Sequence, residues 1–372
     1  MRPQLILVLA LASGYFLGGW SASSRAAEGT GPDAKELQEV LDKAYKYLRE
    51  HQAQDGSFSA KFAGPGVSAV VVAAALRNGV APDDALVAKT LAFITKSVKD
   101  DGGIYDKGMA NYTTSVALMA LVDANKGGKY DTIVKNASAF LKKLQNTADK
   151  EAAEFGGLGY DADNKKPDAS NTQYFLDALL AAGVDKNDPA VKNAIDFISK
   201  CQNLPGETNR LPFAKKTSDD DKGGITYTPI EDGNKHKTPD GGLRSLGAMT
   251  YGGLKSFLYA GVSKDDPRVK AAVSWIRGHY TLEENPGLKK SGLFYYYHTF
   301  AKAMDALGED PFADSKGTKH EWRKELFESL KKQQRPDGSW INEGDKQFGE
   351  SDPNLATAFA ILALSYCHAA KK

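Results

Sequence analysis

Two kinds of helical segment alternate regularly along the chain. Segments of the first kind are amphipathic, and they begin at about Ala34, Asp84, Tyr130, Asp188, Asp266 and Lys319. Segments of the second kind have almost no polar face, and they begin near Val67, Tyr112, Thr172, Thr250, Tyr295 and Leu355. A helix that is apolar all round must be buried on every side. Six such pairs predict an all-α (α/α)6 toroid, a double ring of six inner and six outer helices in which the inner helices run the same way.

An open solenoid of helical pairs is the main alternative, although it would not need every second helix to be so apolar. The connections fit helical pairs in either case. Apolar segments end at glycines, which accept the left-handed conformation that follows a helix: Gly79, Gly183, Gly261 and Gly308. Amphipathic segments start with an aspartate as N-cap, within Asp83-Asp84 or in the pairs Asp188-Pro189 and Asp266-Pro267.

The predicted toroid spans residues 34–372 as a single domain, with a long polar insertion at about 203–242. Such an insertion is either a lid over one mouth of the toroid or a solvated loop. Residues 1–26 are interpreted as a signal peptide, with a basic Arg2, an apolar run at 5–17 and a cleavage site at Ser24-Arg25-Ala26. We therefore expect export to the periplasm or the extracellular space. A retained membrane anchor is the alternative for this segment, and no other stretch is apolar enough to span a membrane.

Charge and cysteine content narrow the function classes. Lysine and arginine number 48 and aspartate and glutamate 47, so no global charge points to nucleic acid or to an anionic surface. Cys201 and Cys367 are the two cysteines. Two cysteines do not make a disulfide framework, and two isolated thiols are expected, with pairing left open.

A short motif recurs between the helical segments. Gln52-Ala-Gln-Asp-Gly-Ser-Phe58 and Gln334-Arg-Pro-Asp-Gly-Ser-Trp340 both read Gln, three residues, Gly, one residue, aromatic. Partial copies are Lys99/Gly103/Tyr105 and Gln202/Gly206/Thr208. The Asp-Gly pair predicts a turn, and the aromatic residue after it can tuck back against the helix that has just ended. We interpret the motif as a brace at the outer edge of the double ring.

From about residue 35 onward, this repeated motif resembles the squalene–hopene cyclase and protein prenyltransferase β-subunit superfamily. For a cyclase the resemblance implies an Asp-x-Asp-Asp-Thr motif whose middle Asp protonates a polyprene alkene. The nearest match is Asp168-Ala-Ser-Asn-Thr172, where Ser170 stands in place of the proton donor and Asn171 replaces the next Asp. A serine hydroxyl cannot be that acid, which argues against cyclisation by this route.

For a prenyltransferase the resemblance implies zinc held by an Asp-x-Cys pair and by a His within Tyr-His-Thr. The chain has Tyr297-His298-Thr299, but Ala248-Met249-Thr250 stands where Asp-x-Cys is expected. We predict no metal site and no cofactor, and an enzymatic activity is left open.

The starts of the inner helices carry the best candidates for a functional site, because parallel inner helices would gather them at one end of the toroid. The candidates for lining a ligand cavity are Tyr112, Asn171, Gln173, Tyr251, Tyr295, Tyr297, Asp352 and Asn354. Asp168 and His298 are the weaker candidates for catalysis. Helix capping alone would explain Asp168 and Asp352, and five consecutive bulky residues at 294–298 cannot all face one way.

The favoured hypothesis is an exported toroid protein whose central cavity binds an apolar or isoprenoid-like ligand. A second hypothesis is a polysaccharide-active enzyme, which would need paired carboxylates such as Asp168 and Asp352 across a cleft. The third is a noncatalytic protein-interaction module that uses the outer ring or the 203–242 insertion.

Overall fold

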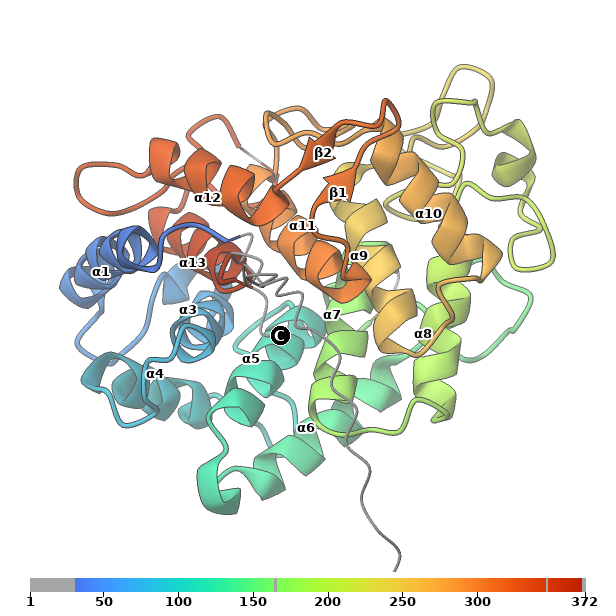
Figure 1. Ribbon diagram of the computed structural model, residues 1–372. Helices are drawn as coiled ribbons and strands as arrows, with labels where there is room; N and C mark the ends of the chain where they lie inside the picture. The colour runs from blue at the N-terminus through green and yellow to red at the C-terminus, as the bar shows by residue number, and fades with distance from the viewer. Residues whose placement is uncertain (1–30, 164–165, 346, 370–372) are drawn as a thin grey trace, which may run out of the picture.

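A computed structural model describes residues 31–163, 166–345 and 347–369, in which the long helices form two concentric rings (Figure 1). The inner ring consists of α3 (Gly66–Arg77), α5 (Ala110–Asp123), α7 (Ala169–Ala181), α9 (Gly247–Tyr259), α11 (Leu293–Leu307) and α13 (Pro353–Leu364). Each inner helix packs against the next, and α13 packs against α3. The ring is therefore closed, which confirms the (α/α)6 toroid and excludes the open solenoid.

The outer ring consists of α1 (Ala34–His51), α4 (Ala85–Lys96), α6 (Asp131–Leu144), α8 (Pro189–Lys200), α10 (Pro267–Gly278) and α12 (Trp322–Gln333). Smaller elements are α2 (Ala60–Ala63), η1 (Lys126–Gly128), η2 (Pro212–Lys216) and the antiparallel pair β1 (Phe312–Ala313) and β2 (Lys319–His320). The predicted starts agree with these bounds to within a turn. The predicted start at Lys319 is corrected, because Lys319 lies in β2 and helix α12 begins at Trp322.

The predicted helix ends are confirmed. The glycines after the inner helices have left-handed backbone, with φ of 86° at Gly79, 78° at Gly183, 84° at Gly261 and 72° at Gly308. The carboxylates at the outer-helix starts accept hydrogen bonds from first-turn amides, as at Asp84, Asp188 and Asp266. These local signals define where the helices begin and end. Closure of the ring comes from packing between the apolar inner helices.

The glutamine of the recurrent motif joins one outer helix to the next. Gln334 Nε2 donates to its own turn at Gly338 O (3.0 Å) and to Val40 O on α1 (2.9 Å). The same pair of bonds, to its own turn and to the neighbouring outer helix, is made by Gln52, Gln145 and Gln202. The motif is therefore a brace between neighbouring repeats, as its sequence indicates.

Each brace is also fixed to the inner ring. The residue two places after the turn glycine is fully buried, and its amide donates to a hydroxyl on the following inner helix, as Trp340 N does to Thr357 Oγ1 at 3.0 Å. The other four pairs are Phe58 with Ser68, Ile104 with Thr114, Leu158 with Thr172, and Ile225 with Thr250. Thr172, retained from the cyclase motif, thus has a structural role.

The partial copies of the motif are corrected by this geometry. The left-handed turn glycines are Gly102 and Gly223, not Gly103 and Gly206. Extra residues separate Gln202 from Gly223, so a search with a fixed spacing finds the wrong partner.

The brace gives a stability prediction for Gly338→Ala. Gly338 has φ of 91°, and an added Cβ would lie 2.2 Å from Lys43 O on α1. We expect a loss of about 2–3 kcal/mol in unfolding free energy, measured by chemical denaturation. Gly344→Ala is the matched control, because nothing lies within 4 Å of its Cβ position. Equal effects of the two substitutions would contradict the brace.

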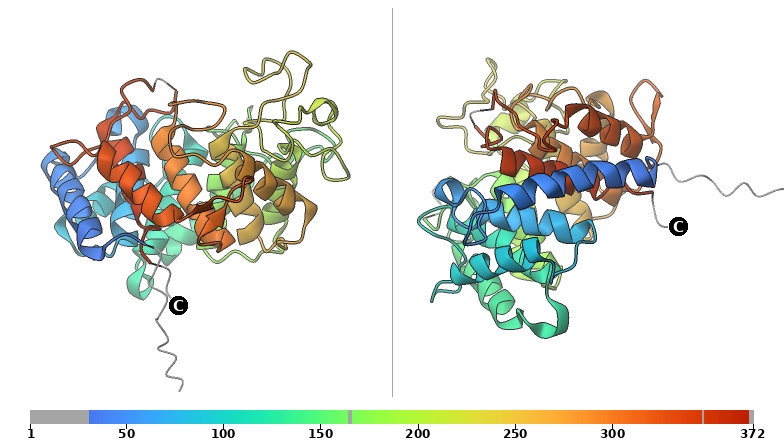
Figure 2. Two further views of the ribbon diagram at one scale, coloured as in Figure 1. Left: turned by 45° about the horizontal axis from the view of Figure 1, so that its top comes forward. Right: turned by 90° about the vertical axis from the view of Figure 1, so that its left-hand side faces the viewer.

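The two ends of the described chain meet, since Gly31 lies against the backbone of Cys367 and Ala369. The 203–242 insertion stands out at the edge of the double ring beside α10 (Figures 1 and 2). It is pinned there by Trp275 Nε1, which donates to Asp220 O at 2.9 Å. The predicted signal peptide at 1–26 lies outside the described residues. Within the described ranges, no helix is long and apolar enough to cross a membrane.

Candidate functional site

The starts of the inner helices converge on a cavity of about 510 Å³ at one end of the toroid. Inner-helix starts contribute Val67, Tyr112, Ser170, Tyr174, Tyr295, Leu355 and Phe359, and the connections contribute Phe62, Ala63, Met109, Tyr160, Asp161, Tyr227, Gln347, Phe348 and Gly349. This size lies within the usual range for ligand-binding pockets. The convergence that parallel inner helices would produce is therefore present.

Aromatic rings form most of the wall. Tyr174 meets Tyr112 edge to face with centroids 5.3 Å apart, and it stacks on Tyr295 at 6.1 Å. Tyr295 in turn stacks on Phe348 at 6.1 Å and contacts Phe359 at 5.7 Å. Burial raises the pKa of Tyr112, Tyr174, Tyr227 and Tyr295, so these side chains are neutral phenols at neutral pH. The aromatic part of the wall is thus uncharged and largely apolar.

The polar groups of the residues that line the cavity are mainly hydroxyls. Ser170 Oγ and Tyr295 Oη are hydrogen-bonded at 2.8 Å, and Gln173 Nε2 also donates to Tyr295 Oη. Asp161 is the one acidic residue among the described lining residues, and none of these is basic. The Asp161 carboxylate accepts a hydrogen bond from Met109 N, whose left-handed backbone (φ of 54°) is uncommon for a residue other than glycine.

Two buried carboxyl groups lie behind this wall. Asp168 caps α7 by accepting a hydrogen bond from the backbone N of Asn171 at 2.7 Å. It also accepts hydrogen bonds from the side-chain Nδ2 of Asn171 and from the Tyr227 hydroxyl. Glu350 accepts from Tyr295 N at 2.7 Å at the start of α11 and from Asn342 Nδ2 at 2.9 Å. Burial raises the pKa of both groups to about 7, against hydrogen bonds that favour the charged form.

A second, much smaller chamber of about 20 Å³ lies deeper along the toroid axis. Tyr174 and Phe359 line both spaces, so they form the floor of the larger cavity. The other lining residues of the chamber are Val70, Ala73, Arg77, Val116, Met119, His298, Lys302 and Leu362. Burial, together with the positive charges of Lys302 and Arg77, holds the pKa of His298 well below its ordinary value.

Next to the chamber, three inner helices share a buried ion cluster. Asp177 on α7 bonds to Lys255 on α9 and to Lys302 on α11, both at 2.7 Å. Burial alone would raise the pKa of Asp177, but the two ammonium groups outweigh it and lower the pKa below the ordinary value. Burial lowers the pKa of Lys255 to about 8 despite the attraction of Asp177. The cluster ties three inner helices together.

The structure brings some of the predicted residues to the cavity and places others elsewhere. Tyr112 and Tyr295 line it, Gln173 supports Tyr295 from behind, and His298 lies in the deeper chamber. The prediction that Tyr297 lines the cavity is wrong, because its hydroxyl donates to Leu282 O on the outer side of α11. The same prediction is wrong for Tyr251, which is fully buried away from the cavity against Tyr296 and Phe300.

The remaining predicted residues act near helix starts. Asn171 supports Asp168, and Asp352 caps α13 by accepting from the amides of Asn354 and Leu355. Asn354 Nδ2 donates to Ser59 Oγ at 3.0 Å, next to α2. These contacts correct the prediction for Asn171, Asp352 and Asn354, since none of the three lines the cavity.

Sequence reasoning missed several aromatic lining residues, above all Tyr160 and Tyr227. Both follow a turn glycine by four positions, in Gly156-Gly-Leu-Gly-Tyr160 and Gly223-Gly-Ile-Thr-Tyr227. In these two braces the buried anchor is Leu158 or Ile225, and the tyrosine two places later is free to face the cavity. The sequence signal for these tyrosines was the aliphatic residue at the anchor position, which indicates that the later aromatic residue is not the anchor.

The residues present do not fit the zinc site of a prenyltransferase. Ala248 and Met249 offer no ligand where Asp-x-Cys is expected, and His298 has Lys302 and Arg77 around it. No group of three or more His, Cys, Asp or Glu side chains within the described residues could hold a metal ion. Cys201 and Cys367 are buried free thiols.

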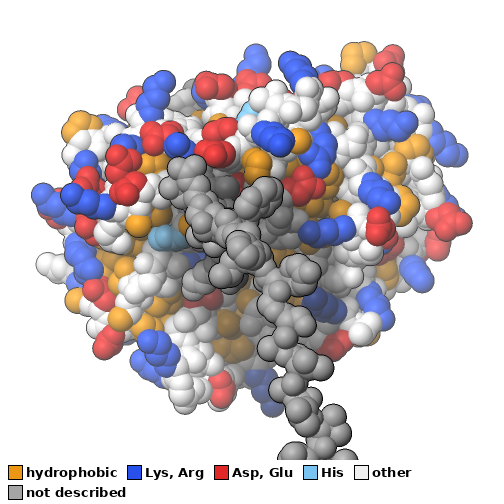
Figure 3. Space-filling view, in the orientation of Figure 1, with side chains coloured by type: hydrophobic (Ala, Val, Ile, Leu, Met, Phe, Trp, Pro, Cys, Tyr) orange, Lys and Arg blue, Asp and Glu red, His pale blue; other side chains and the backbone are white. Residues whose placement is uncertain are grey.

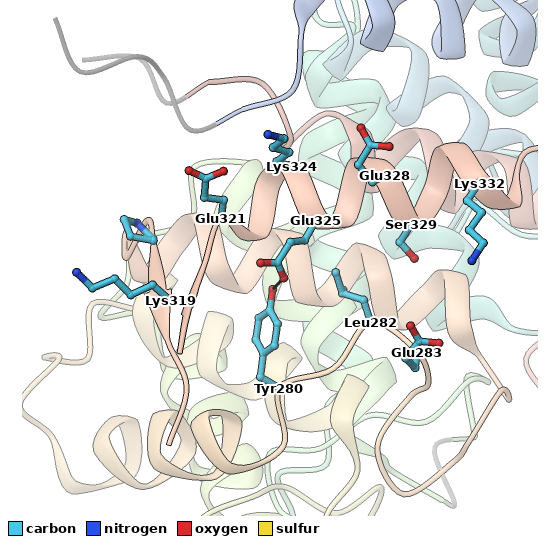
Figure 4. A pocket seen from close by; sticks show the side chains of 11 residues that line it. Tyr280, Leu282, Glu283, Lys319, Glu321, Lys324, Glu325, Glu328, Ser329 and Lys332 are labelled. Atoms are coloured by element: carbon cyan, nitrogen blue, oxygen red, sulfur yellow. Dashed lines mark hydrogen bonds between the residues drawn. The ribbon is translucent and has the colours of Figure 1, made fainter. Parts of the chain in front are cut away.

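A larger hollow of about 910 Å³ lies on the outside of the toroid, against α12. Figure 4 shows acidic and basic side chains around it, and the Tyr280 hydroxyl donates to Glu325 there at 2.9 Å. On the face shown in Figure 3, basic and acidic side chains are likewise interspersed over the surface. The outer groove therefore has no single charge preference, and the aromatic cavity is the more distinctive site.

Comparison with known proteins agrees with this architecture. Residues 61–217 match the family model of the squalene-hopene cyclase C-terminal domain, which covers less than half of the chain. No curated protein matches the chain in sequence.

One similar solved structure is an inactive variant of the α-1,6-mannanase GH76A of Salegentibacter sp. HEL1_6 in complex with α-1,6-mannotriose. The TM-score is 0.58 at 10% sequence identity, and the match covers 89% of this chain and 99% of the mannanase chain. A variant of the type II terpene cyclase MstE from Scytonema has a TM-score of 0.54 at 14% identity, covering 89% and 97%. A D-mannose isomerase has a TM-score of 0.56 at 13% identity, covering 90% and 97%. At these identities the likeness is one of fold.

The class of protein is thus an (α/α)6 toroid with an aromatic cavity at the starts of its inner helices. The family model matched over residues 61–217 confirms the resemblance to squalene–hopene cyclases seen in the sequence, and the likeness to the terpene cyclase agrees with it in fold.

Proposed function

We propose that this protein, exported through its N-terminal segment, binds an apolar or isoprenoid-like ligand in the 510 Å³ cavity. The observation that carries the proposal is the continuous aromatic wall built from neutral tyrosine and phenylalanine rings. Such a wall gains free energy by burying apolar surface, and the described lining offers no basic group to an anionic ligand. The squalene–hopene cyclase-like fold supports the same ligand class.

Cyclisation by protonation is not part of the proposal. Ser170, at the position of the proton donor, faces the cavity and is hydrogen-bonded to Tyr295. The two retained residues of the motif have structural contacts, since Asp168 caps α7 and Thr172 holds the brace at Leu158. The part of the motif that would do chemistry is therefore the part that differs.

Glycoside hydrolysis by paired carboxylates has no specific observation in its favour. It would need two carboxyl groups facing a shared cleft. Asp168 and Asp352 are both engaged with helix-start amides, and neither lines the cavity. The mannanase likeness is confined to the fold.

Truncating the wall tests the proposal. Phe348 is partly exposed at the mouth and stacks on Tyr295, so Phe348→Ala should weaken binding of farnesol about fivefold to tenfold with little effect on folding. Binding is measured by calorimetry and by the ligand-induced rise in Tm.

Tyr105→Ala is the matched control, because Tyr105 is a partly exposed ring that stacks on Phe140 outside the cavity. The control should bind farnesol as the unmodified protein does. Absence of farnesol binding and of any copurifying lipid would refute the proposal.

A further inference from the structure

The floor of the cavity contains a hydroxyl group without a partner. Tyr174 is 6% exposed, and its Oη makes no hydrogen bond among the described residues. The neighbouring Tyr295 Oη, by contrast, bonds to both Ser170 and Gln173. A buried hydroxyl left unpaired costs free energy, so one on a residue that lines a cavity would gain a hydrogen bond from a ligand group brought beside it.

A second unpaired polar atom lies on the far side of the same floor. His298 is 5% exposed, its Nδ1 has no partner among the described residues, and it lines the 20 Å³ chamber together with Tyr174. Because the pKa of His298 is held well below its ordinary value, its imidazole is neutral at neutral pH. It therefore offers one ring nitrogen as donor and one as acceptor.

The size of the chamber restricts what can approach the Tyr174 and His298 side chains that line it. A volume of about 20 Å³ has room for one water-sized group. A hydroxyl oxygen is of this size, whereas a carboxylate or a phosphate group is larger. The two cations that border the chamber are already engaged, Lys302 with Asp177 and Arg77 with Asp123.

We propose that the ligand is an isoprenoid alcohol that binds with its hydroxyl at the cavity floor, hydrogen-bonded to Tyr174 Oη next to His298, and with its hydrocarbon chain against the aromatic wall. This inference rests on the proposed function and adds the head group and the orientation of the ligand. The chain of the alcohol extends toward the mouth, where Phe62 is 56% exposed and Phe348 covers Tyr295.

A double comparison of ligand and variant tests the proposal. Farnesol, farnesene and farnesoic acid are the probes, since they present a hydroxyl, no polar group and a carboxylate on similar chains. Tyr174→Phe should weaken farnesol binding about threefold to tenfold, the loss of one hydrogen bond, and should leave farnesene binding within twofold. The unliganded variant should be at least as stable as the unmodified protein, because the deleted hydroxyl has no partner.

Tyr45→Phe is the matched control, since the Tyr45 hydroxyl is also buried without a described partner but lies on the outer helix α1. It should change neither affinity. If Tyr174→Phe weakens farnesol and farnesene equally, or neither, the hydroxyl contact does not exist and the head-group proposal is wrong while apolar binding stands. A Tyr174 dependence for farnesoic acid alone would also overturn it, and failure of all three probes to bind would refute the proposed function itself.

Discussion

Replacing Asp177 by asparagine is expected to lower the unfolding free energy by about 3–5 kcal/mol, because it leaves two buried ammonium groups without a counterion. The Lys255 and Lys302 side chains are only 3% and 8% exposed, and both are 2.7 Å from the Asp177 carboxylate. Chemical denaturation at pH 7 measures the loss. The loss should shrink as the pH rises toward about 8, because without the Asp177 charge the buried lysines release their protons at lower pH than in the unmodified protein.

Asp123→Asn is the matched control for this prediction. Asp123 pairs with Arg77 at 2.9 Å, but these side chains are 26% and 22% exposed, so we expect a cost below about 1 kcal/mol. A triple variant with Asp177→Leu, Lys255→Met and Lys302→Met should recover most of the stability lost in Asp177→Asn. Similar costs for Asp177→Asn and Asp123→Asn would show that the cluster is not desolvated.

The double ring is the part of the fold that local sequence patterns define well. Helical periodicity separates inner from outer helices, and the glycine and aspartate signals at their ends coincide with the observed caps. Ring closure follows because an apolar helix such as α13 needs neighbours on all sides. The braces were harder to locate, since the connection between Gln202 and Gly223 contains most of the insertion's first half.

The cavity wall could be predicted only in part, because it depends on which face of each inner helix points to the axis. On α11 the axis face carries Tyr295, His298 and Lys302, at helical spacing, while Tyr297 lies two residues out of phase and points outward. Phase alone would therefore have excluded Tyr297.

The signal that would have set this phase is a lone charge in an otherwise apolar helix. Asp177 and Lys255 are the single charges of α7 and α9, Lys302 is the first charge of α11, and a buried charge requires a partner. Counting back from Asp177 by one and two turns reaches Tyr174 and Ser170, both of which line the cavity. Tyr160 and Tyr227 lie in connections, and no helical phase places them.

The unfolding free energy is expected to depend on pH through two buried carboxyl groups. Asp168→Asn and Glu350→Gln should each gain stability relative to the unmodified protein as the pH rises from about 4.5 to about 7. Burial raises the pKa of both carboxyl groups to about 7, so in this range the folded protein holds protons that the unfolded chain has released. The stability that each group contributes is full below the unfolded pKa near 4 and is lost as the pH passes about 7. The slope is at most about 1.4 kcal/mol per pH unit for each group.

Comparing each variant with the unmodified protein isolates the carboxyl group, since His298, whose lowered pKa gives the opposite slope, is present in both. Asn still caps α7 in the variant at Asp168, so the cap itself is kept. Asn354→Ala is the control, because Asn354 lies at the start of α13 and carries no ionisable group, so its difference should stay flat. If the difference for Asp168→Asn is flat as well, Asp168 is ionised throughout, and the wall behind Tyr227 carries a negative charge that would favour a cationic ligand over an uncharged isoprenoid.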